Sequence, residues 1–200
     1  VQGPDHARAP EAWVLRGFVY KDLFKQAPQG PEAGALRQEA LNSLYISTEL
    51  DTAREFSQSS LQAYDFLAKT LYNDAARALN ELDQEKAQAD YSRYKEAVLR
   101  LDPGRDLSER DIEFNNALGT VYTKRFNLAR EQEEWFDQAV QTYRHVLELD
   151  PGNYGANYNL ATLFYNRGVY NIQRVSAEND IPSLQRIQEV SRDLFMEALP

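Results

Sequence analysis

The chain has no cysteine, a single methionine and no long apolar run. Without cysteine, thiol catalysis, thiolate metal sites and disulfide bonds are excluded. No apolar stretch approaches the roughly 20 residues that a membrane-spanning helix needs. Only nine glycines and eight prolines interrupt the 200 residues, which favours long helices over a turn-rich fold.

Basic residues are fewer than acidic ones, so the net charge is −9 and the pI is about 4.8. A phosphate backbone is repelled by that average field, so we expect no nucleic-acid partner. The densest basic segment is Thr123–Arg125, and an acidic run follows it at once. The acidic excess indicates solubility more than a specific cationic ligand.

The first residues, VQGPDHARAP, contain no apolar signal core. We expect residues 1–9 to form a flexible leader, and we expect no membrane span elsewhere. The absence of cysteine fits any compartment.

Three stretches of the chain end in the same way. Each has an amphipathic helical pattern that closes on Leu-Asp and a helix breaker: EALNSLYISTELDT, YSRYKEAVLRLDPG and QAVQTYRHVLELDPG. Pro103 and Pro151 cannot continue a helix, and each disfavours helical geometry in the aspartate before it. These stretches predict an internal repeat that closes on the second helix of a helix pair.

A second type of helix precedes the closing one, in AWVLRGFVY, FNNALGTVY and ANYNLATLF. Each places a small residue three positions before an aromatic one, namely Gly17, Gly119 and Ala161 before Tyr20, Tyr122 and Phe164. The small residue allows a neighbouring helix to come close, and the aromatic ring fills the volume beside it. We therefore expect tight helix pairs at these positions.

These residues resemble the tetratricopeptide repeat family. The segment DPGNYGANYNLATLFYNRGVY (residues 150–170) follows the family pattern without a gap. The resemblance implies an all-α, right-handed superhelix, or α-solenoid, of about four antiparallel helix pairs. It implies one array over residues 10–200, with approximate repeats 10–52, 53–104, 105–152 and 153–200.

The repeats differ from the family in length, because their ends recur at roughly 50 residues whereas family repeats take about 34. We interpret the extra residues as added helical turns, as in the elongated repeats common in bacterial solenoids. Because of this likeness, the bacterial periplasm or cell envelope is favoured slightly over the cytoplasm as the expected location. The expected helices are about 10–26, 34–50, 54–80, 84–101, 108–130, 133–149, 153–177 and 181–199.

Residues with catalytic or metal-binding chemistry are few. The two histidines, His6 and His145, stand apart from any metal-ligand or nucleophile pattern, so we expect no catalytic residue, no metal and no cofactor. Glu133 and Glu134, followed by Trp135, could bind or hydrolyse a carbohydrate. A charged run on a helix is, however, usually a solvated face.

The resemblance implies a groove formed by the first helices of the pairs, which binds an extended peptide or a partner helix. We therefore expect a noncatalytic protein–protein interaction scaffold. The residues just off the packing positions combine aromatics with Asn, Thr and Lys, which suits a peptide backbone with apolar side chains. They are Val14, Phe18, Lys21, Tyr72, Asn80, Asn116, Thr120, Lys124, Tyr158, Thr162 and Tyr165.

Some family members grip a C-terminal carboxylate with paired Asn and Lys. Only Asn159 falls on such a position here, since the partner positions hold Phe18 and Thr120. Two alternatives to peptide binding stay open. One is a self-assembling structural component of a bacterial envelope complex, with copies joined through the terminal helices, and the other is the carbohydrate-binding protein above.

Overall fold

The computed structural model describes residues 8–175 and 180–198, and these residues form eight α-helices and no strand. The chain is therefore all-α over the described part, as the apolar period predicts. The helices are α1 (Pro10–Gln26), α2 (Ala33–Leu50), α3 (Ser57–Asn80), α4 (Gln84–Leu101), α5 (Ser108–Leu128), α6 (Glu133–Leu149), α7 (Tyr154–Gln173) and α8 (Ile181–Glu197).

Each predicted helix is present, and most boundaries agree within two residues. The largest differences are at α3, which begins at Ser57 instead of residue 54, and at α7, which ends at Gln173 instead of residue 177. Most of the expected leader, residues 1–7, lies outside the described residues.

The late start of α3 has its cause in Asp51. The Asp51 carboxylate accepts hydrogen bonds from the backbone N–H groups of Glu55 (2.9 Å) and Phe56 (2.8 Å) and from the Ser57 hydroxyl (2.8 Å). Burial raises the pKa of the Asp51 carboxyl, but the hydrogen bonds from Ser57, Phe56 and Glu55 together outweigh this effect and hold the pKa below its usual value. The ionised side chain thus holds the segment before Ser57 in a turn.

Other helix ends follow side-chain rules. The carboxylates of Asp83 and Asp180 and the amide oxygen of Asn153 each accept a backbone hydrogen bond from the first turn of the next helix, at α4, α8 and α7. Pro182 follows the Asp180 cap within the first turn of α8, where a proline is compatible with the helix. At the other ends, Asp102 and Asp150 adopt ψ values of 86° and 90° before proline, which stops α4 and α6.

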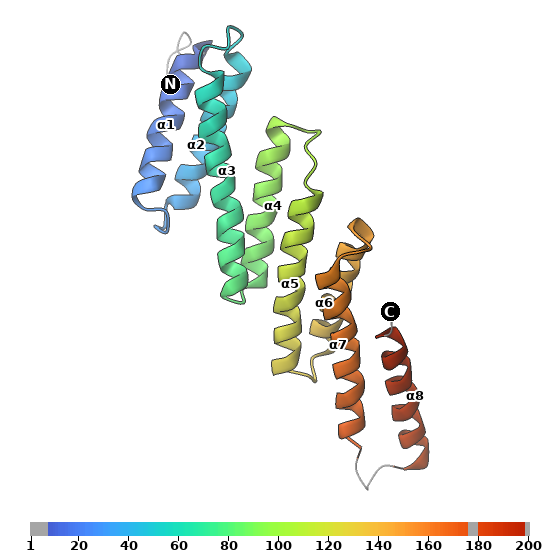
Figure 1. Ribbon diagram of the computed structural model, residues 1–200. Coiled ribbons are helices and arrows are strands. Elements are labelled where there is room, and N and C mark those ends of the chain that lie inside the picture. Colours follow the sequence, from blue (N-terminus) through green and yellow to red (C-terminus); the bar gives the residue numbers. More distant parts are fainter. Residues whose placement is uncertain (1–7, 176–179, 199–200) are drawn as a thin grey trace. The chain divides into compact units, whose positions relative to one another are not determined.

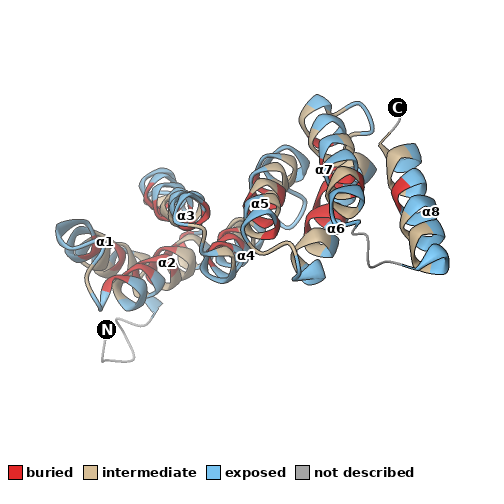
Figure 2. Cartoon of the chain, turned by 90° about the horizontal axis from the view of Figure 1, so that it is seen from below, coloured by how far each residue is buried: buried red, intermediate tan, exposed pale blue. Residues whose placement is uncertain are grey.

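The helices form two compact units, Val1–Arg105 and Asp106–Pro200. The first unit contains α1 to α4 and the second contains α5 to α8. In each unit, consecutive helices form antiparallel hairpins, α1 with α2, α3 with α4, α5 with α6 and α7 with α8 (Figure 1). The buried residues line the facing sides of these hairpins (Figure 2).

In the first unit, α3 packs on both α2 and α1. Gly17 of α1 lies directly against Leu44 of α2, since a Cβ built on Gly17 would be 2.6 Å from the Leu44 Cγ. This close approach is the one predicted from the small residue. Leu44 of α2 and Tyr64 and Leu67 of α3 are fully buried, and the Tyr64 hydroxyl donates to the Ala97 carbonyl of α4.

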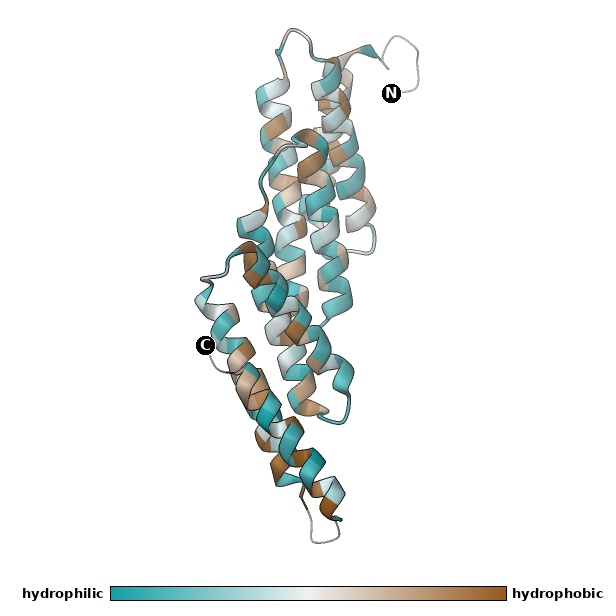
Figure 3. Cartoon of the chain, turned by 90° about the vertical axis from the view of Figure 1, so that its right-hand side faces the viewer, coloured by the Kyte–Doolittle hydropathy of each residue, from teal (hydrophilic) through white to brown (hydrophobic). Residues whose placement is uncertain are grey.

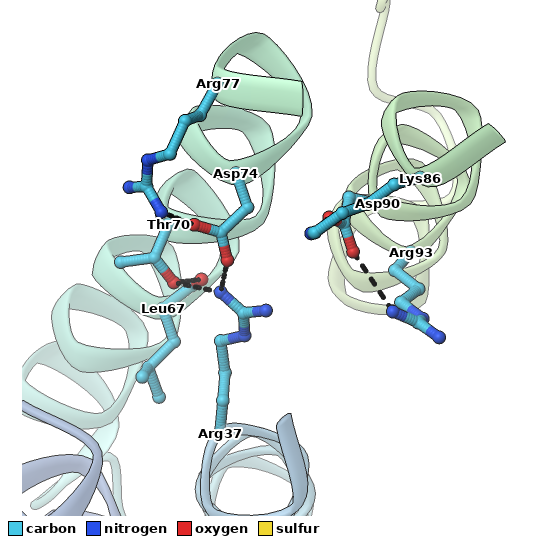
Figure 4. A network of polar contacts seen from close by, with 8 residues as sticks. All are labelled: Arg37, Leu67, Thr70, Asp74, Arg77, Lys86, Asp90 and Arg93. Atoms are coloured by element: carbon cyan, nitrogen blue, oxygen red, sulfur yellow. Dashed lines mark hydrogen bonds and ion pairs between the residues drawn. The ribbon is translucent and has the colours of Figure 1, made fainter. Parts of the chain in front are cut away.

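A buried ion pair also joins α2 to α3. Arg37 is 6% exposed, and its Nη1 donates to the Asp74 carboxylate at 2.7 Å and to the Thr70 hydroxyl at 3.1 Å. Figure 4 shows the Arg37 side chain reaching from α2 to these two residues of α3, with Arg77 on the far side of Asp74. The guanidinium also lies 5.2 Å from the centre of the Phe24 ring of α1. Arg37 therefore fixes α3 against the α1–α2 pair.

The second unit repeats the arrangement, with α7 packed on both α6 and α5. Gly119 of α5 lies against the buried Tyr143 ring of α6, since a Cβ built on Gly119 would be 2.6 Å from the Tyr143 Cε1. This is again the close approach predicted from the small residue. In the α7–α8 hairpin, Gly168 makes the close approach, against Phe195. The small residue predicted for this pair, Ala161, is only half-buried. The first helices of successive pairs therefore touch within each unit, α1 with α3 and α5 with α7.

Candidate functional site

A cavity of about 290 Å³ lies between α1 and α3 in the first unit. Two of the predicted binding residues, Phe18 and Lys21, line it. The lining residues are Phe18, Lys21, Lys25, Ser59, Gln62, Ala63 and Phe66.

Helical spacing explains why these side chains meet. On α1 the lining residues recur three and four positions apart, and on α3 the same spacing runs from Ser59 to Phe66. Side chains at this spacing lie on one face of a helix. Gly17 and Arg37 then fix α1 and α3 against α2, so the two walls of the cavity are set by core packing.

The cavity is positively charged. The Lys21 Nζ lies 4.0 Å from the centre of the Phe18 ring, and the Lys25 Nζ lies 6.0 Å from the centre of the Phe66 ring. Both distances are within the range of a cation–π attraction. No acidic side chain is among the described residues that line the cavity. The site is thus a cationic pocket with aromatic walls in a chain whose net charge is −9.

Three other predicted residues of the first unit lie outside this pocket. Val14 is half-buried one turn before Phe18. Tyr72 contacts the rings of Tyr91 and Tyr94 of α4, at centroid distances of 6.0 and 5.3 Å, so it packs within the α3–α4 hairpin. Asn80 is exposed as the last residue of α3.

On α5, Asn116, Thr120 and Lys124 follow one another at four-residue spacing. Asn116 donates from Nδ2 to Asn153 Oδ1 at 3.1 Å, which links α5 to the cap of α7. The Thr120 hydroxyl donates to the Asn116 carbonyl at 3.0 Å, and Lys124 is exposed. The first two are therefore partly structural.

On α7, Tyr158, Thr162 and Tyr165 are exposed, and the two tyrosines expose 59% and 56% of their surface. Tyr158 stacks on Tyr154 at a centroid distance of 6.0 Å, and Tyr165 contacts Phe195 at 5.6 Å. In the second unit, α7 thus presents exposed tyrosine side chains.

Sequence reasoning missed Lys25, Gln62 and Phe66. Lys25 is one helical turn after Lys21, so extension of the α1 face by one turn identifies it. The α3 residues had a weaker signal. The positions predicted on α3, Tyr72 and Asn80, stand in its second half, whereas the α3 residues that line the pocket lie between Ser59 and Phe66. The extra helical turns displaced the expected positions to Tyr72 and Asn80.

The second unit has two further cavities. One, of about 740 Å³, lies between α7 and α8 and is mainly apolar; Figure 3 shows apolar segments along these helices. Its lining residues are Ile172, Val175, Leu184, Ile187, Gln188, Ser191, Arg192, Phe195 and Met196. The other, of about 600 Å³, is formed by α6, α7 and α8 and is more polar.

The residues of the carbohydrate alternative have structural partners. Glu133 forms an ion pair with Arg167 of α7. Trp135 stacks on Tyr122 at a centroid distance of 6.1 Å, and its Nε1–H donates to Gln132 Oε1 at 2.7 Å. Glu134 is exposed. One face of the indole is therefore occupied by protein.

Two general features complete the description. None of the helices within residues 8–175 and 180–198 combines the length and the apolar character that a bilayer crossing requires. Within the same ranges, no three histidine, aspartate or glutamate side chains gather where they could hold a metal ion.

Comparison of the chain with protein-family models, with curated proteins and with solved structures found no match. The resemblance to tetratricopeptide repeats therefore stays a prediction that depends on the residues quoted above.

Proposed function

We propose that the chain is a noncatalytic binding scaffold of the tetratricopeptide-repeat type, whose first helices bind an extended peptide or a partner helix. The observation that carries this proposal is the pocket between α1 and α3. It is lined by Phe18 and Lys21, two of the residues that the sequence predicts to bind a peptide.

The chemistry of the first-helix faces suits a peptide. Ligand sites combine aromatic and apolar walls with a few polar groups that fix orientation. The α1–α3 pocket has two phenylalanine rings and two ammonium groups, and α7 offers the exposed Tyr158 and Tyr165. These aromatic side chains provide contact area, and the lysines provide orientation.

The proposal is tested with an array of randomised decapeptides and the whole chain. Peptides that bind are then titrated against Tyr158→Ala with Tyr165→Ala, against Phe18→Ala, and against Ile181→Ala as a control. Ile181 is 72% exposed at the start of α8 and lies outside both first-helix faces. We expect the first two variants to lose affinity and the control to retain it. Equal affinity in all variants would refute the assignment of the binding faces.

A second candidate function is self-assembly, and the cavity between α7 and α8 favours it. Its lining includes Ile172 and Met196, which expose 48% and 63% of their surface. Clustered exposed apolar side chains commonly mark an interaction surface. In this proposal a second copy of the chain covers the cavity.

Phe195 packs on Gly168 and is part of the hairpin core, so its replacement would disturb folding. Met196→Asp is the better test, with Leu128→Asp as a control because Leu128 is 80% exposed at the end of α5. Sedimentation at rising concentration should show dimers that Met196→Asp abolishes and Leu128→Asp retains. A monomer at all concentrations would exclude self-assembly.

A further inference from the structure

We propose that the pocket between α1 and α3 binds the carboxylate of an acidic side chain, Asp or Glu, in the peptide ligand. This inference rests on the proposed peptide-binding function and specifies the class of ligand at one place on the binding face.

Lys21 is poorly neutralised by the carboxylates around it. Its side chain is only 15% exposed, and its one carboxylate neighbour among the described residues is Asp22, at 3.8 Å. That distance is at the outer limit of an ion pair, and the Asp22 side chain is 63% exposed and directed largely to water. A mostly buried cation is unfavourable unless an anion or acceptor compensates it. A ligand carboxylate in the cavity would supply this compensation.

Both charged side chains of the pocket come from α1. Lys21 and Lys25 are one helical turn apart on α1 and line the same cavity. Within the described part of the chain, no ion pair joins Lys25 to a carboxylate. Two lysines on one side of a cavity without an acidic lining create a local positive field. One carboxylate can accept hydrogen bonds from both.

The pocket is small and has two aromatic side chains in its walls. A cavity of about 290 Å³ is at the lower limit of ligand-binding cavities, so it suits one or two side chains. The Phe18 and Phe66 rings form apolar walls that suit the methylene groups of a Glu side chain or an apolar neighbour in the peptide.

The net charge of the chain argues against larger anions. At −9, the average field repels a nucleic acid or another polyanion at long range. A peptide with a single acidic residue is repelled far less, and the local field of Lys21 and Lys25 then acts at short range. The observations therefore favour a peptide side chain.

The experiment uses the full chain and two arrays of randomised decapeptides, one with amidated C-termini and one with free C-termini. The amide removes the terminal carboxylate, so any acidic preference must come from a side chain. The tightest binder is then titrated by calorimetry, alongside its Glu→Gln or Asp→Asn version. The protein variants are Lys21→Met and Lys25→Met, with Lys69→Met as the control. Lys69 is 68% exposed on α3, pairs with Asp65 and does not line the pocket.

We expect the selected peptides to be enriched in Asp or Glu at one position. Loss of the peptide carboxylate, or of either pocket lysine, should weaken binding about 10-fold to 100-fold, since a hydrogen bond to a charged group has that effect on a binding constant. Affinity should also fall as salt rises, whereas Lys69→Met should bind like the parent chain.

A thermal melt separates binding from a structural role. Lys21→Met should melt at or above the temperature of the parent chain, because it replaces a poorly neutralised cation with an apolar side chain of similar length. If Lys21→Met does not fold, Lys25→Met alone decides, because Lys25 is exposed.

Three outcomes would overturn the inference. Peptides that bind with no acidic preference, or with no loss in either lysine variant, would refute the carboxylate site while leaving peptide binding intact. Peptides that bind only with a free C-terminus would assign the site to a terminal carboxylate instead. The absence of binders in both arrays would refute the proposed function together with the inference.

Discussion

At the scale of single residues, the turn between α3 and α4 places Leu82 in a left-handed conformation, with φ of 59°. The Asp83 N–H donates to the Ala78 carbonyl at 2.9 Å and the Leu82 N–H to the Leu79 carbonyl at 3.1 Å. This is the hydrogen-bond pattern of a helix end that usually has glycine at the left-handed position. Leucine has a Cβ that strains the turn there.

We therefore expect Leu82→Gly to be more stable than Leu82→Ala by about 1 kcal/mol. Both variants remove the same side-chain packing, so their difference isolates the backbone strain. Urea unfolding followed by circular dichroism measures it. Equal stability of the two variants would show that the turn is unstrained.

Tyr64 gives a residue-scale prediction about pH. Its hydroxyl is buried and donates to the Ala97 carbonyl at 2.8 Å, and burial raises the pKa of this phenol to about 12. An unfolded tyrosine ionises near pH 10. The contribution of Tyr64 to stability is therefore complete below pH 10 and is lost as the pH rises towards 12.

The test compares the parent chain with Tyr64→Phe at several pH values. Below pH 10 the parent should be more stable by about 1 kcal/mol, the usual value of one hydrogen bond. The difference should shrink steadily between pH 10 and 12, because only the parent loses stability through this group. A constant difference across that range would mean that Tyr64 ionises as freely in the folded chain as in the unfolded one.

At the scale of helices, the small residues decide how closely the hairpins pack. A Cβ on Gly119 would lie 2.6 Å from the ring of Tyr143, which is 1% exposed and has no space to move. We expect Gly119→Ala to destabilise the chain by about 1 to 3 kcal/mol, as overpacking does.

The control is Gly34→Ala in the first turn of α2, where no atom lies within 4 Å of the added Cβ. That variant should be neutral or more stable by about 0.5 to 1 kcal/mol, because alanine favours a helix. Chemical denaturation of the two variants gives the comparison. A tolerated Gly119→Ala would mean that the α5–α6 hairpin is loosely packed.

The Arg37–Asp74 pair is the polar counterpart of this packing. Asp74→Leu would leave Arg37 buried without a carboxylate, and we expect a loss of about 3 kcal/mol. Arg37→Met should cost less, because Asp74 retains Arg77 at 3.2 Å. The double variant should therefore be more stable than Asp74→Leu alone.

Asp65→Leu is the matched control, because Asp65 pairs with Lys69 at the surface and should contribute less than about 1 kcal/mol. Thermal unfolding of the four variants gives the coupling energy. Equal losses in Asp65→Leu and Asp74→Leu would show that the buried pair does not hold α2 against α3.

The helices and much of the packing could be predicted from the sequence, whereas the full pocket could not. The period of apolar residues, the Asp-Pro ends and the small residues Gly17 and Gly119 are local signals, and local signals determine helices and hairpin contacts. The pocket depends on which part of α3 meets α1. That register is set by the Asp51 turn and by the Arg37–Asp74 pair. The pair joins residues 37 positions apart in the sequence, so Phe66 could not be predicted from local signals.

At the scale of the whole molecule, the contacts divide the chain into two compact units near residue 105. Each unit contains two hairpins that bury apolar faces on each other, which one hairpin alone cannot do. We expect the fragments 1–105 and 106–200 each to be helical and to unfold cooperatively when produced separately.

The control fragment is residues 1–52, which contains only the α1–α2 hairpin and lacks α3, the helix that packs on both α1 and α2. It should show little cooperative unfolding. Circular dichroism during urea titration distinguishes these cases. A disordered 1–105 fragment would show that the first unit depends on the rest of the chain.

The same division has a spectroscopic consequence. The chain has two tryptophans, and each unit contains one of them, Trp13 on α1 and Trp135 on α6. Trp135 is stacked on Tyr122, and Trp13 lies 5.8 Å from the Arg16 guanidinium, so their intrinsic emission should differ in the folded state. Trp135→Phe and Trp13→Phe would then each leave one label-free optical reporter, with which the melting of either half can be followed inside the intact protein.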